Sequence, residues 1–287
     1  MVRHALWDGK FYPGDAKHLA TQVDALLAAW PPRPDAPAPW ALLVPHAGYP
    51  YSGACAAAAY AGLPATPSRV LLLGPNHHRP LAGFGLSRAE RWETPLGDVE
   101  VDAAAVDALL AGGAPFAPAE EALALEHSLE VQLPFLQRLG GESPPRVLPI
   151  LVGRCSAADR EEAARRLGDI ARPGDLWVVT TDLSHFHALE RAEALDAETA
   201  RLIEAGDADA FALALAKGRA EACGAEPDQH ERGDASTAIG QSACDRRPVE
   251  ADEPHAHDDY VDSLAIACAM TKDATMPKIQ IASNPFY

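Results

Sequence analysis

Histidine and aspartate side chains follow three short apolar runs that predict buried strands. His46 stands in P-H-A-G-Y-P-Y-S-G, His77 in G-P-N-H-H, and Asp182 and His185 in T-T-D-L-S-H. In open parallel sheets, ligands bind in the crevice beyond the carboxyl ends of the strands. Two histidines with one further soft or anionic ligand make an open site for Fe(II), Cu or Zn, with positions left for water or substrate. We therefore predict a metal site around His46 and His77.

A further histidine motif, E-H-S, places His127 at the start of a predicted helix over residues 128–139. Unpaired N–H groups at a helix start favour anions and lower the pKa of an imidazole there. A neutral imidazole beside the crevice is suited to act as a general base or as a hydrogen-bond donor. His127 is therefore a candidate for proton transfer.

Simpler roles compete for several of these residues. Asp182 precedes a helical stretch and could instead cap its N-terminus. Cys223 on its own would be a small buried apolar residue. His78 and His187 are expected to be loop residues, as most single histidines after strands are. The Gly and Pro neighbours of the two strand-end histidines favour a site, because they permit close backbone approach and fix the side-chain direction.

Four continuous apolar runs are the candidate strands that position these residues: 40–44, 69–73, 146–152 and 175–181. Stretches rich in alanine and leucine, which favour helix, alternate with strands through most of the chain. They cover residues 16–30, 55–61, 103–111, 128–139, 157–170, 188–205 and 208–217. Apolar strands between helices are typical of a parallel sheet covered on both faces. We predict an α/β fold: a single domain with a mostly parallel central sheet, helices on both faces, and a hairpin at residues 92–101.

Composition excludes several classes of function. The chain has 287 residues, and no apolar run is long enough for a transmembrane helix, which needs about 18 residues. The first ten residues lack the pattern of a signal peptide, and the five cysteines form no C-x-x-C pair, so we expect reduced thiols in a cytoplasm. A net charge of −17 argues against binding nucleic acid or an anionic membrane.

The ordered motifs of this chain resemble those of the Memo family. The series is A-L-W-D-G-K-F-Y-P, P-H-A-G-Y-P-Y-S-G, L-L-L-G-P-N-H-H, T-P-L-G-D, E-H-S-L-E-V-Q-L-P-F, I-L-V-G and T-D-L-S-H-F, and it covers residues 5 to 225. The resemblance implies the fold of the catalytic subunit of class III extradiol ring-cleaving dioxygenases. It also implies AMMECR-type and radical SAM proteins as partners, and a small-molecule substrate of unknown identity.

The resemblance also implies roles for individual residues. It assigns His46, His77 and Cys223 as ligands of Fe(II) or Cu, with Zn as an alternative. His127, Asp182 and His185 then line the pocket as catalytic groups. In the related dioxygenases the third ligand is a carboxylate, so a cysteine at that position departs from the dioxygenase ligand set.

The tail, residues 226–287, departs from the family. Residues 226–262 carry 11 acidic residues and three arginines and lose the apolar periodicity. With suitable synonymous codons, a one-nucleotide shift turns E-P-D-Q-H-E-R-G-D into S-P-I-N-T-S-A-V-M, which resembles the family continuation. We therefore expect a frameshifted, poorly packed tail that adds no closing strand and displaces Cys223, although residues 278–281 could form an edge strand.

Three functions fit these observations. The first is metal-dependent oxidoreductase chemistry, dioxygenase-like, on a small substrate. The second is a non-catalytic module that binds a peptide or protein in the same crevice. The third is a zinc-dependent hydrolase, in which the metal activates water.

Overall fold

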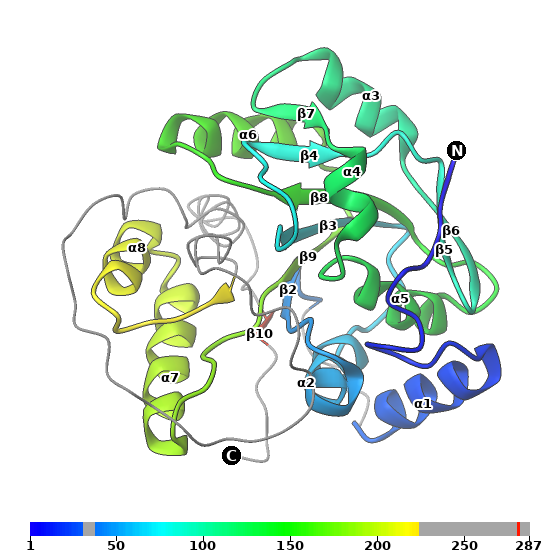
Figure 1. Cartoon of the computed structure of the whole chain (residues 1–287), viewed down its shortest axis with the longest axis horizontal. Helices are drawn as coiled ribbons and strands as arrows, with labels where there is room; N and C mark the ends of the chain where they lie inside the picture. Colours follow the sequence, from blue (N-terminus) through cyan, green and yellow to red (C-terminus); the bar gives the residue numbers. More distant parts are fainter. Residues whose placement is uncertain (31–37, 224–279, 282–287) are drawn as a thin grey trace.

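A seven-stranded sheet forms the centre of the molecule (Figure 1). The structure is a computed structural model that describes residues 1–30, 38–223 and 280–281. Across the sheet the strands are β10 (Gln280–Ile281), β2 (Ala41–Val44), β9 (Leu176–Thr180), β3 (Arg69–Pro75), β8 (Arg146–Val152), β4 (Phe84–Leu86) and β7 (Phe116–Pro118). All neighbouring strands run parallel except β4 and β8, which are antiparallel.

The four apolar runs form the four central strands. Every residue of β2, β3 and β9 is buried, and β8 is buried after its first residue. Burial on both faces explains why these strands have continuous apolar sequences and no alternation of polar and apolar residues. The predicted α/β fold with a mostly parallel sheet is confirmed.

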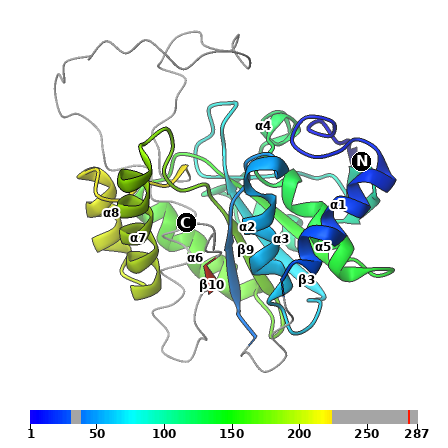
Figure 2. The same cartoon turned by 90° about the horizontal axis from the view of Figure 1, so that it is seen from below.

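Helices cover both faces of the sheet, as Figure 2 shows. One face carries α1 (Ala16–Ala28), α2 (Tyr49–Ala61) and α5 (Leu133–Gly140), which pack against one another. The other carries α6 (Ala157–Ile170), α7 (Leu189–Ala205) and α8 (Ala208–Ala216). The shorter helices α3 (Ala103–Ala111) and α4 (Glu120–Leu125) pack near β7 and β4. No described helix is long and apolar enough to cross a membrane.

A small second sheet holds the N-terminus against the domain. It contains β1 (Val2–Arg3), β5 (Arg91–Thr94) and β6 (Gly97–Glu100). The last two form the hairpin predicted for residues 92–101, with antiparallel pairing from Arg91 opposite Glu100 to Thr94 opposite Gly97. The Arg3 guanidinium lies 4.2 Å from the centre of the Trp92 ring, which adds a cation–π contact to this junction.

Glu130 anchors the segment that follows β1. It lies in η1 (Glu130–Gln132), a 3₁₀ helix, and its side chain is completely buried. The carboxylate accepts hydrogen bonds from Arg3 Nη1 at 2.7 Å, the Trp7 backbone N–H at 2.9 Å and the Tyr12 hydroxyl at 2.6 Å. A buried carboxylate needs such compensation, and these bonds fix the N-terminal loop beside E-H-S.

Two predicted helices differ from those observed. Helix α2 begins at Tyr49, earlier than the predicted residue 55, because Pro50 fits the first turn of a helix, where no N–H is needed. The predicted helix over 128–139 is interrupted: η1 precedes α5, and Pro134 lies in the first turn of α5. His127 therefore does not begin a regular α-helix.

The described part of the tail is β10. It pairs in parallel with β2, Gln280 opposite Leu42 and Ile281 opposite Leu43, at the edge expected for residues 278–281. For these two residues the expectation that the tail adds no strand to the sheet is wrong. The rest of the tail, including the sequence tied to the frameshift hypothesis, lies outside the described residues.

Candidate metal centre

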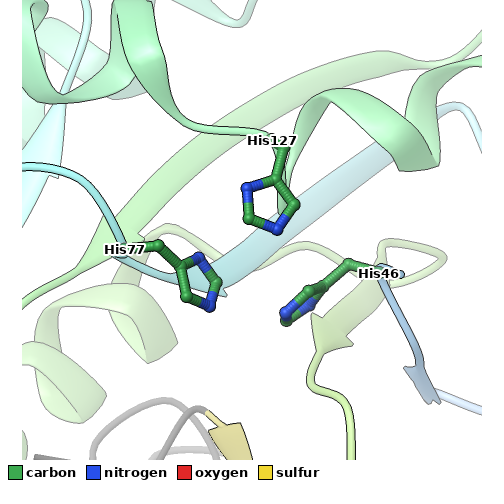
Figure 3. A group of neighbouring side chains, drawn as sticks. All are labelled: His46, His77 and His127. Carbon is green, nitrogen blue, oxygen red and sulfur yellow. The ribbon is translucent and has the colours of Figure 1, made fainter. Parts of the chain in front are cut away.

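Three imidazoles from separate segments point toward one another (Figure 3). His46 follows β2, His77 follows β3, and His127 lies between α4 and η1. Their potential ligand nitrogens all lie within 4.8 Å of one another. The ring centres of His46 and His77 are 5.1 Å apart, and those of His77 and His127 are 4.6 Å apart. The carboxyl ends of β2 and β3, which lie on either side of β9, and the segment before η1 thus bring together residues distant in sequence.

Cys223 completes this cluster. Its Sγ lies 3.1 Å from His46 Nε2 and accepts a hydrogen bond from the Asp182 backbone N–H at 3.0 Å. The Cys223 N–H in turn donates to the Asp182 carbonyl at 2.9 Å. This reciprocal backbone connection ties Cys223 to the loop after β9, so the expectation that the thiol would be displaced is wrong.

In both His46 and His77, the ring nitrogen Nδ1 makes a hydrogen bond with another side chain. His46 Nδ1 is 2.8 Å from Thr180 Oγ1, which also accepts from Gln132 Nε2 at 3.1 Å. His77 Nδ1 is 2.9 Å from Glu126 Oε1, and the His77 backbone N–H donates to Glu126 Oε2. Bonds of this kind fix the ring orientation of histidines that bind metals through Nε2.

The donor atoms fit a metal ion of intermediate or soft character. Two imidazoles and a thiolate are ligands for Zn, Cu and Fe, whereas Mg and Ca prefer oxygen donors. Asp182 adds an oxygen donor, since His46, Cys223 and Asp182 also have potential ligand atoms within 4.8 Å of one another. The residues present therefore suit a three-ligand site with room for a fourth donor.

Cys223 and the two imidazoles shift one another's pKa values. Burial alone would raise the pKa of Cys223, but the charge of His46 and hydrogen bonds with His46 and His77 outweigh it and lower the pKa to about 6. Burial would lower the pKa of His77, yet hydrogen bonds with Cys223 and Glu126 raise it to about 10. The cluster therefore favours a thiolate at neutral pH, the form of cysteine that binds metals.

His127 has the opposite character. Burial is the main cause that lowers its pKa to about 3, helped by the nearby His77 and His46 charges and opposed by Glu126. The imidazole is neutral at pH 7, as predicted, but the cause is burial among other imidazoles and not a helix start. Glu126 itself keeps a lowered pKa despite burial, because of its hydrogen bond with His77 and the His77 charge.

Asp182 and His185 lie on another side of the cluster. Asp182 Oδ1 accepts from the His46 backbone N–H at 2.7 Å, and its Oδ2 lies 3.8 Å from both His46 Nε2 and His185 Nε2. Both residues line a cavity of about 550 Å³. His127 does not line it and packs instead against Phe11, with ring centres 4.6 Å apart. This cavity therefore brings together Asp182 and His185, and a shared cavity that also includes His127 stays a prediction.

Sequence reasoning missed four contributors. Glu126 and Thr180 hold the histidine rings, and the motifs E-H-S and T-T-D contained them without a stated role. His78, which we expected to be a loop residue, has its Nε2 3.4 Å from His127 Nδ1. Its ring stacks on Trp7 at 5.3 Å, so the N-terminal W-D-G-K-F motif forms one wall of the site. In the sequence, that motif indicated the family but did not show where it would lie in the fold.

Comparisons with known proteins point to one family. The family profile described as Memo-like protein matches residues 3–230. A MEMO1 family protein of Aquifex aeolicus is 39% identical over 197 residues, 68% of this chain and 72% of the relative. A MEMO1 family protein of Aeropyrum pernix is 34% identical over 244 residues, 79% and 85% of the two chains. Protein MEMO1 of Danio rerio is 32% identical over 195 residues, 65% and 63% of the two chains. With a family match that spans most of its length, this chain belongs to the Memo family.

Proposed function

We propose that the chain is a metal-binding protein that holds Fe(II) or Cu through His46, His77 and Cys223 and carries out oxidoreductase chemistry on a small substrate. One observation carries the proposal. Cys223 Sγ lies 3.1 Å from His46 Nε2, and His46 and His77 each have Nδ1 held by a separate partner, Thr180 or Glu126. Hydrogen bonds at the second ring nitrogen are characteristic of histidines that bind metals.

A bound Fe(II) or Cu would supply one-electron chemistry and polarisation of a substrate oxygen. The chain itself supplies proton handling around that point. His127 is neutral at pH 7 and its Nδ1 lies 3.4 Å from His78 Nε2, so it is suited to donate a hydrogen bond to a substrate. His185 lies 3.8 Å from Asp182 on the cavity side, where that carboxylate can orient it toward a substrate.

The test is anaerobic purification followed by metal analysis and by titration with Fe(II), Cu(I) and Zn(II). We expect close to one equivalent of Fe or Cu per chain, and loss of tight binding in His46→Ala, His77→Ala and Cys223→Ser. His18→Ala removes an exposed histidine of α1 and is the matched control. An oxygen-consumption screen on the loaded protein then tests oxidoreductase chemistry.

Two outcomes would contradict the proposal. Equal metal binding by the wild type and the three variants would show that His46, His77 and Cys223 are not the ligands. Tight binding of zinc alone, without oxygen consumption, would favour the zinc-dependent hydrolase, because zinc has no redox chemistry and activates water.

A further inference from the structure

The cavity beside Asp182 is lined by acidic and apolar side chains. It lies between the end of β2, the start of α2, the loop after β9 and one face of α7. Its volume of about 550 Å³ falls within the range of small-molecule pockets, roughly 300–1,000 Å³. Three carboxylates line it, those of Asp182, Glu193 and Asp196, and no lysine or arginine is among the described residues of the lining.

The remaining walls are mostly apolar. Leu43 and Pro45 come from the end of β2 and its loop, Leu183 from the loop after β9, and Leu189 from α7. Tyr51 and Leu189 are large apolar side chains that stay exposed at this cavity, 88% and 56% respectively. Exposed apolar groups next to a concave surface are a mark of ligand binding in soluble proteins.

The two carboxylates on α7, those of Glu193 and Asp196, are placed so that they can contact a ligand. Asp196 uses Oδ1 to accept the Ser184 backbone N–H at 3.0 Å, which orients the carboxylate, and no described hydrogen bond is made by its Oδ2. Glu193 is exposed one turn earlier on the same face of α7. Asp182 faces His46 and His185 at 3.8 Å, whereas Glu193 and Asp196 form no ion pair with a described lysine or arginine within 4.0 Å and can face a bound cation.

We propose that this cavity binds a small organic amine, with its ammonium group among Asp182, Glu193 and Asp196 and its apolar body against Tyr51 and the leucines. Charge complementarity favours the cation and opposes carboxylates and phosphates. Asp182 belongs both to this lining and to the donor cluster with His46 and Cys223, so a bound amine would lie next to the metal centre. The inference rests on the proposed function, because it names the substrate class of that site.

The experiment compares three probes of similar shape: phenethylamine, 2-phenylethanol and 3-phenylpropionate. Binding to the full chain is measured by calorimetry or ligand-observed NMR, with the metal-free and the metal-loaded protein. We expect the amine to bind about tenfold more tightly than the alcohol, and the carboxylate to show no binding. The double variant Glu193→Gln with Asp196→Asn should weaken amine binding about tenfold and leave the alcohol unchanged.

Glu190→Gln is the matched control, since it removes a carboxylate from the first turn of α7 outside the cavity lining. Thermal unfolding checks that every variant is folded. Equal binding of amine and alcohol, tighter binding of the carboxylate, or full amine binding by the double variant would overturn the inference. If the chain takes up no metal but still binds the amine, the inference stands and only the metal proposal is refuted.

Discussion

At the scale of single residues, neighbouring side chains set the charge of Cys223 and His77 and the ring orientation of His46 and His77. Cys223 and His77 illustrate this, because each shifts the pKa of the other toward the charged form. The imidazolium and thiolate together resemble the arrangement that makes a cysteine reactive and ready to bind a metal. The two residues therefore cannot be understood separately.

Alkylation of the metal-free protein tests the charge of Cys223. The pKa is lowered from 9.0 to about 6, so the thiolate exists above about pH 6 and is lost as the pH falls through that value. We expect the iodoacetamide rate at Cys223, followed by peptide mass spectrometry, to have its midpoint near pH 6. Cys55 is an internal control, because burial and the Asp182 charge raise its pKa to about 11. A Cys223 midpoint near 9 would contradict the imidazolium–thiolate pair.

Glu126→Gln tests the support of His77. The neutral amide loses the negative charge opposite His77 Nδ1 and places an NH₂ group where a carboxylate oxygen now accepts an N–H. We expect metal affinity, measured by chelator competition, to fall about 10- to 100-fold. Glu121→Gln, at an exposed position of α4, should leave the affinity unchanged. Unaltered affinity in Glu126→Gln would show that this carboxylate does not support a ligand.

At the scale of elements, loops at strand ends and a short 3₁₀ turn build the site, while the sheet provides a rigid base. The loops after β2, β3 and β9 each deliver one or two site residues, and η1 holds the N-terminal wall. Because these segments are separate in sequence, their relative positions depend on a few buried polar contacts.

The buried contacts of Glu130 lead to a stability prediction. Glu130→Ala leaves the buried Arg3 guanidinium, the Trp7 N–H and the Tyr12 hydroxyl without their acceptor. Removing one partner of a buried ion pair costs about 3–5 kcal/mol, so the free energy of unfolding should fall by that order in urea denaturation. Glu142→Ala at an exposed site should change it by less than about 0.5 kcal/mol. A small effect at Glu130 would mean that water replaces the carboxylate.

At the scale of the whole molecule, the candidate metal centre joins both halves of the described chain. His46 comes from the first fifth of the sequence, and Cys223 is the last residue of the described range 38–223. A ligand that binds only the folded state stabilises it by about 2.7 kcal/mol at a concentration 100-fold above its dissociation constant.

Thermal unfolding should therefore respond to metal. Anaerobic addition of Fe(II) or Cu(I) should raise the melting temperature of the wild type, and by much less in His77→Ala. His18→Ala should behave like the wild type. A metal-induced rise of equal size in His77→Ala would place the bound metal elsewhere on the protein.

The acidic tail gives a prediction at the level of the gene. If the chain after Ala225 results from a shifted reading frame, the codons that follow should read S-P-I-N-T-S-A-V-M after a one-nucleotide change. Resequencing that region tests this directly. Codons that give no such reading in either shifted frame would refute the hypothesis.

Motifs, apolar runs and residue types were enough to predict the family, the central strands and the residues that could do chemistry. Continuous apolar runs such as 69–73 can only be satisfied by burial on both faces, and this requirement gives a parallel sheet with helices around it. The same logic placed His46, His77 and Asp182 at strand ends, because polar side chains and glycine or proline turns stop an apolar run.

How those residues interact could be learned only from their positions in the fold. Glu126 and Thr180 contact the Nδ1 atoms of His77 and His46 because segments distant in sequence meet in the fold. A local sequence pattern does not show which distant oxygen will be near a given ring nitrogen. The low pKa of His127 comes from burial among three other imidazoles, and the separation of Asp182 and His185 from His127 comes from which side of the cluster each loop approaches. These properties depend on distances between side chains in space, which the packing of the complete fold fixes.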